Sequence, residues 1–166
     1  FATSAKLAFG DANEDVIIGY RSIGTIDNRT SQVCRAYDQE VRSKKDRDWS
    51  GFQTPRHPNC RSALVPEVNG KYKYDDSASK RPSNLKVDGT RDPKRVSSKQ
   101  TYYDSLKQLN AADQDAILGP TLGKAFRKLD DPEAFASATI DTLGNPLTIT
   151  QMKARDNELS RVLNNL

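Results

Sequence analysis

Residues 19–41, GYRSIGTIDNRTSQVCRAYDQEV, decide the expected architecture of this chain. They continue a segment rich in β-branched and aromatic residues, so we expect a strand or a bent pair of strands over residues 15–26, interrupted at Gly19 and Gly24. A cluster of turn residues follows and ends in good N-cap residues, which predicts a short helix over about residues 32–40. A strand that leads through a polar turn into a short helix is therefore the first unit of the fold.

A second stretch, TPRHPNCRSALVPEV at residues 54–68, supplies the returning strand. The two prolines beside His57 favour extended backbone, because a residue that precedes proline avoids the helical region. Residues 61–65 then predict a short strand that ends at Pro66. We therefore expect residues 1–68 to form a small strand–helix–strand core.

Residues 69–100 hold all of the basic excess of the chain. The net charge is +4, and this segment has nine Lys or Arg against four Asp or Glu. Because it lacks a periodic apolar pattern, we expect a basic extended arm or linker. A solvated linker is one interpretation and a nucleic-acid contact is the other, with phosphate binding by side chains and stacking of bases on Tyr72 and Tyr74. The candidate phosphate contacts are Lys71, Lys73, Lys80, Arg81, Lys94 and Arg95.

Residues 101–166 predict a module of short helices, because signals for helix ends recur along them. Thr101 with Asp104 forms a capping-box pattern, and Asn110 is a second N-cap. Further start and stop signals are Gly119, Pro120, the pair Asp131-Pro132, and Thr150 as the cap of one last helix with an apolar stripe from Met152 to Leu166. The sequence thus predicts an α+β protein in three parts: 1–68, 69–100 and 101–166.

Composition limits the class of protein. Hydrophobic residues make up 35% and charged residues 29% of the chain, and the mean hydropathy is −0.79. Apolar runs fall short of the roughly 18 residues of a membrane span, and residues 1–15 lack the pattern of a secretory signal, so we expect no membrane partner. The chain begins at Phe1 and its one methionine is Met152, so we expect an N-terminal part to have been removed.

Cys34, His57 and Cys60 are candidate metal ligands. His57 and Cys60 form an H-x-x-C loop whose spacing lets both side chains reach one ion, and Cys34 on the short helix adds a third soft ligand. We therefore predict that the three side chains converge and hold one structural zinc, with Asp38 or Asp27 as the fourth ligand.

The same residues allow three other interpretations. They are a reduced hydrogen-bonded cluster, a disulfide, and a catalytic site in which Cys34 is the nucleophile, His57 the base and one of the two aspartates the orienting group. His57 is the one histidine of the chain, so a Cys–His enzyme has to use it. The neighbouring Arg29 and Arg61 are expected either to pair with these aspartates or to be solvated.

The two quoted stretches resemble the signature of the phage Mu F-like head morphogenesis family, the minor head proteins of tailed bacteriophages. That pattern runs from a strand through T-x-D-x-R-T to a cysteine on a helix, then a variable polar loop, P-x-H-x-N-C-R and a closing strand. Residues 101–128 are similar to the segment that often follows. Here the pattern is carried by Thr25, Asp27, Arg29, Thr30, Cys34, Pro55, His57, Asn59, Cys60 and Arg61.

The resemblance implies a structural minor head protein rather than an enzyme. It implies the portal protein, the major capsid protein or both as partners, several copies in the head or neck of the virion, assembly in the host cytoplasm, and contact with packaged DNA. The alternative is a nucleic-acid-binding protein or a metal-dependent nuclease that uses the basic arm and the Cys/His cluster. The sequence has no paired carboxylates, P-loop or Gly-rich phosphate motif to favour that alternative.

Overall fold

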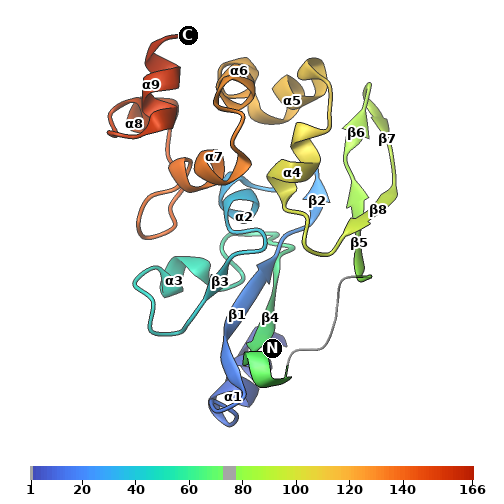
Figure 1. Ribbon diagram of the computed structural model, residues 1–166, viewed down its shortest axis with the longest axis vertical. Helices are drawn as coiled ribbons and strands as arrows, with labels where there is room; N and C mark the ends of the chain where they lie inside the picture. Colours follow the sequence, from blue (N-terminus) through green and yellow to red (C-terminus); the bar gives the residue numbers. More distant parts are fainter. Residues whose placement is uncertain (1, 73–77) are drawn as a thin grey trace.

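The computed structural model describes residues 2–72 and 78–166 and confirms the predicted α+β class (Figure 1). Among these residues no helix is long and apolar enough to cross a membrane. The elements in chain order are α1 (Ala2–Asp11), β1 (Ile17–Ile23), β2 (Ile26–Asp27), α2 (Gln32–Ala36), β3 (Val41–Arg42), α3 (Trp49–Phe52), β4 (Ala63–Val68), the 3-10 helix η1 (Gly70–Tyr72), β5 (Lys80–Asn84), β6 (Lys86–Val87), β7 (Thr90–Arg91), β8 (Lys94–Ser97), α4 (Tyr102–Lys107), α5 (Ala111–Leu118), α6 (Pro120–Leu129), α7 (Pro132–Ala138), α8 (Ile149–Lys153) and α9 (Glu158–Asn164).

The strands form two small three-stranded sheets and one hairpin. In the first sheet β1 lies between β3 and β4 and pairs antiparallel with both. In the second, β5 pairs parallel with β2 and antiparallel with β8, while β6 and β7 form the hairpin. The predicted strand over residues 15–26 is thus a bent pair, β1 and β2, and each half joins a different sheet.

Two clusters of buried side chains fill the molecule. The cluster beside the first sheet is built from β1, α2, α3 and β4, with Phe52 and Tyr37 in edge-to-face contact. The larger cluster lies among helices α4 to α9, where Phe135 contacts the rings of Tyr103 and Phe126. Helix α2 belongs to the first cluster. Its Gln32 amide also donates to the carbonyls of Thr139 and Leu147, which follow α7, at 2.6 and 3.0 Å.

The expected extended arm is wrong for the described part of residues 69–100. Leu85 and Val96 are 1% and 8% exposed and belong to the helical core, so this segment is folded onto the protein. Strands β6 and β7 are joined by Asp88 and Gly89, whose φ angles of 50° and 76° match the two-residue turn that favours this dipeptide. Short strands that each bury one or two side chains do not produce the apolar periodicity on which the prediction rested.

Most predicted helix signals are confirmed, and the last helix is corrected. Thr101 forms its capping box, and Asn110 caps the next helix as predicted. The predicted final helix is two helices: Thr148, not Thr150, caps α8, and Asn157 caps α9 by accepting from the Ser160 N–H. The helix predicted over residues 32–40 ends at Ala36, before Gln39 takes a φ of 71°.

Strand β4 also differs from its prediction, because it continues through Pro66 to Val68. It lies at the edge of its sheet, where proline is tolerated since one side of the strand needs no ladder hydrogen bonds.

Candidate metal centre

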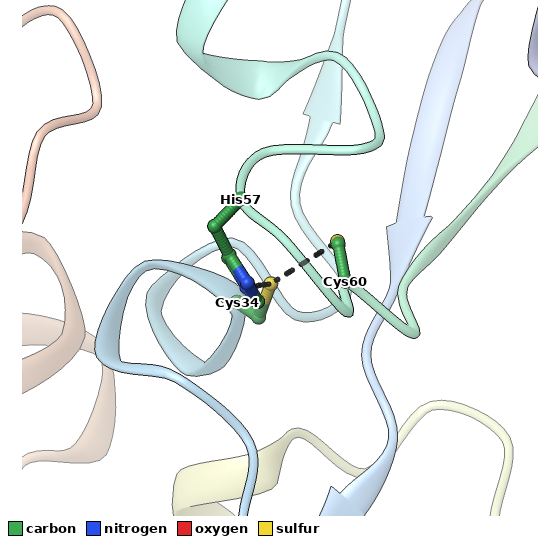
Figure 2. A group of neighbouring side chains, drawn as sticks. All are labelled: Cys34, His57 and Cys60. Carbon is green, nitrogen blue, oxygen red and sulfur yellow. Dashed lines mark hydrogen bonds between the residues drawn. The ribbon is translucent and has the colours of Figure 1, made fainter.

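Cys34, His57 and Cys60 converge as predicted (Figure 2). The two sulfurs lie 3.7 Å apart, and the Cys34 sulfur lies 3.3 Å from His57 Nε2. All three ligand atoms lie within 4.8 Å of one another, and both cysteines are free thiols. A group close enough to bind one metal ion is therefore present.

Local structure places each of the three side chains. Ser31 is the N-cap of α2 and accepts a hydrogen bond from the Cys34 N–H, which directs this first helical turn toward the loop that follows α3. In that loop the Cys60 N–H donates to the His57 carbonyl at 3.1 Å, and Asn59 has a φ of 61°. This tight turn is what lets the H-x-x-C spacing present both side chains on one side.

Hydrogen bonding sets the tautomer of His57. Its Nδ1 lies 2.8 Å from the Pro58 carbonyl, which can only accept, so Nδ1 carries the proton. The unprotonated Nε2 then faces the Cys34 sulfur and the Ser31 hydroxyl, which is 2.8 Å away. Metal-ligating histidines usually have this arrangement, with the far ring nitrogen donating to a carbonyl or carboxylate.

The surroundings of Cys34 favour its thiolate. The residue is 2% exposed, and although this burial opposes ionisation, hydrogen bonding from Ser31 and the charge of Arg56 outweigh it and lower the pKa of Cys34. The Arg56 guanidinium lies 3.8 Å from the sulfur and packs over the rings of Tyr37 and Phe52. Within the described residues Arg56 forms no ion pair with a carboxylate, so a Cys34 thiolate is the anion best placed to balance it.

Two of the three ligand separations are close to those of a tetrahedral ion. Bonds of about 2.3 Å to sulfur and about 2.0 Å to nitrogen place two sulfurs about 3.8 Å apart, and a sulfur and a nitrogen about 3.5 Å apart. The separations here are 3.7 Å between the sulfurs and 3.3 Å between the Cys34 sulfur and the His57 nitrogen. The third pair, the Cys60 sulfur and the His57 nitrogen, lies within 4.8 Å, so His57 and Cys60 would have to move closer to each other around an ion.

The predicted fourth ligands are wrong, because each aspartate is bound to an arginine instead. Asp27 accepts two hydrogen bonds from Arg61, one of them at 2.8 Å, and a third from Thr30. Burial opposes the ionisation of Asp27, but these bonds outweigh it and lower its pKa. The predicted pairing of Arg61 with an aspartate is confirmed, whereas Arg29 exposes its side chain.

Asp38 is the other rejected ligand. Its two oxygens accept from the Arg81 guanidinium at 3.0 and 3.1 Å, and one of them also accepts from the Gly24 N–H at 2.7 Å. The carboxylate is fully buried in this network. Both oxygens are therefore occupied by hydrogen bonds from Arg81 and Gly24 and do not face the cysteines as ligands.

The catalytic interpretation loses its orienting carboxylate for the same reason. Cys34 and His57 are at a distance suited to a nucleophile and a base, but the main-chain carbonyl of Pro58 holds the far side of the imidazole. Beside the cluster the surface is hollowed by only about 20 Å³, room for about one water molecule. Its lining collects residues of both motifs: Thr25, Arg29, Thr30, Ser31, Cys34, His57, Asn59, Arg61 and Ser62.

The candidate phosphate contacts do not form one group. Lys80, Lys94 and Arg95 are exposed on β5 and β8, whereas Lys71 lies in η1. Arg81 is 7% exposed and paired with Asp38, so its prediction as a phosphate contact is wrong. Lys73, like Tyr74, lies outside the described residues.

Several residues that matter in the structure were not singled out by the sequence analysis. Arg56 lies beside the metal ligands, whereas Ser31, predicted as the N-cap, also contacts His57. Lys86 and Arg91 stand on the β6–β7 hairpin, for which the Asp88-Gly89 dipeptide is a recognised signal.

No protein-family model, curated protein or solved structure matches this chain.

Proposed function

We propose that this chain is a structural protein whose Cys34–His57–Cys60 cluster binds one zinc ion. The observation that carries the proposal is the convergence of two sulfurs and one imidazole nitrogen within 4.8 Å of one another. Thiolate and imidazole ligands suit zinc, and calcium and magnesium prefer oxygen. The described residues supply three ligands, and the small adjoining hollow has room for one water molecule as the fourth.

The ion acts by joining two separate segments. Cys34 lies on α2, and the other two ligands lie in the loop between α3 and β4. Because the unfolded chain has no preformed site, zinc binding adds directly to the stability of the folded state. In a reducing cytoplasm the thiols stay available for the metal rather than forming a disulfide.

The hydrogen bond from His57 to a main-chain carbonyl holds the imidazole in place for an ion, as it does in structural and catalytic sites alike. The support for a structural role is that the three ligands come from two separate segments of the chain.

Metal analysis and thiol counting test the zinc site. The purified chain should hold one zinc, show no rapidly reactive thiol, and with cobalt give the absorption of a tetrahedral ion with two thiolates. Cys34→Ser, Cys60→Ser and His57→Gln should each lose at least tenfold in metal affinity, whereas Ser137→Ala, at an exposed position on helix α7, should not. Two freely reactive thiols and less than about one zinc per ten chains at saturating zinc would overturn the proposal.

We also propose that the protein works in the head of a tailed phage, bound to the portal protein, the major capsid protein or both. The support is the ordered resemblance to minor head proteins, together with the gathering of its motif residues around one hollow. Co-expression with portal and major capsid protein tests this role: the chain should sediment in several copies with the assembled particles. Recovery only as a free monomer would contradict it, and would leave the zinc proposal standing.

A further inference from the structure

The second sheet and the β6–β7 hairpin carry four exposed basic residues, which we name the basic ribbon: Lys80 on β5, Arg95 on β8, Lys86 on β6 and Arg91 on β7. All four are exposed. The strands that carry them run together along one side of the molecule (Figure 1).

Strand alternation separates the inward and outward faces of the β5–β8 pair. Arg81 and Val96 are opposite each other and are buried toward the core. The next pair, Pro82 and Arg95, is exposed, as is Lys80. The alternate residues of these strands face the core, so the basic side chains stand on the outward face.

The β6–β7 hairpin places two cations directly opposite each other. Lys86 pairs in register with Arg91, and like charges at such positions destabilise a hairpin. Among the described residues neither these two nor Lys80 and Arg95 have a carboxylate within ion-pair distance. Within the described residues no ion pair relieves this repulsion, although Asp88 in the turn and Asp92 beside Arg91 lie close by, and a bound anion would relieve it further.

The ribbon is held firmly. The Lys86 N–H donates to Asn28, and at the hairpin turn the Asp88 N–H donates to Asp113 while Asn110 donates to the Asp88 carboxylate. The main chain that carries the four cations is therefore fixed, so binding costs little backbone entropy.

We propose that the basic ribbon binds the phosphate backbone of duplex DNA, independently of sequence. A duplex offers closely spaced phosphates, and a two-stranded ribbon has the dimensions to lie against its groove. Residues 80–97 contain no aromatic side chain, so the ribbon has no platform on which unpaired bases could stack. The surface therefore fits binding to the phosphate backbone of a duplex. This binding does not depend on the metal centre.

Fluorescence anisotropy with a labelled duplex of about 20 base pairs tests the proposal. Each phosphate contact adds about 0.9 to the slope of log affinity against log salt, so four contacts predict a loss of roughly 100-fold between 50 and 200 mM salt. Lys86→Gln/Arg91→Gln should halve that slope, so that the loss becomes about 10-fold. The control Lys124→Gln/Lys153→Gln has the same change of net charge on two exposed lysines of helices α6 and α8 and should leave the slope unchanged.

Thermal unfolding of the same variants separates binding from folding. Because Lys86→Gln/Arg91→Gln removes a repulsion, the variant should be at least as stable as the parent protein while it binds DNA more weakly. Absence of duplex binding at 50 mM salt, equal effects of ribbon and control variants, or tighter binding to single strands would each overturn the proposal.

Discussion

Replacing Arg81 with methionine should strongly destabilise the protein, because it leaves Asp38 without its cation. The Asp38 carboxylate is fully buried, and the Arg81 side chain is 9% exposed. The guanidinium also donates to the Gly24 and Gln100 carbonyls, so it links β5 to the first sheet and to the segment before α4. Breaking a buried pair from one side costs about 3–5 kcal/mol, far more than the pair itself contributes.

The cost should depend on pH, with a defined sign. Burial already raises the pKa of Asp38, and the charge of Arg81 opposes that rise. In Arg81→Met this opposition is lost, so the folded-state pKa of Asp38 rises further above its unfolded value of about 3.9. The folded state then binds a proton that the unfolded state releases, and stability falls as the pH rises between the two values. The destabilisation should therefore be smaller at pH 4.5 than at pH 7.

Urea unfolding of Arg81→Met, Asp38→Asn and the double variant, at pH 4.5 and pH 7, measures these quantities. The double variant should be more stable at pH 7 than the sum of the two single costs predicts, because it removes both charges together. Other carboxylates titrate equally in Arg81→Met and in the parent protein, so the difference between the two isolates Asp38. A cost below about 1 kcal/mol at pH 7, or an equal cost at both pH values, would refute the reasoning.

Three further outcomes are expected. Zinc retention should fall as the pH is lowered, because protons compete for Cys34, Cys60 and His57; metal analysis after dialysis across pH 5–8 measures it. Phe135→Ala should cost about 3–5 kcal/mol in denaturant unfolding, because the ring is 0% exposed between two aromatic neighbours. Gly51→Ala should lower the melting temperature, because a Cβ there would lie 2.0 Å from the Leu143 carbonyl oxygen, whereas Gly70→Ala, with no atom within 4 Å, should not.

Local interactions explain which parts of the fold could be predicted from the sequence. The caps at Thr101 and Asn110 depend on atoms three residues away, so their patterns were sufficient. The H-x-x-C turn is equally local, and it was enough to suggest that His57 and Cys60 share a site.

Distant partners explain what could not be predicted. Asp38 was a reasonable metal ligand until the fold brought Arg81 to it from 43 residues away. The pairing of β2 with β5 also joins distant segments, and a sequence without apolar periodicity gives no sign of it. The break between α8 and α9 depends on Asn157, a residue that fits a continuous helix poorly but was outweighed by the apolar stripe around it.

The hydrogen bonds from α2 to the far end of the chain have a consequence for the order of folding. Gln32 contacts the carbonyls of Thr139 and Leu147, which follow it by 107 and 115 residues. During synthesis, most of the chain must therefore be made before the helix that carries Cys34 has all of its contacts. Contacts of such long sequence separation form late and slow folding, so zinc bound early would hold α2 against the 57–60 loop while the C-terminal helices are still being made.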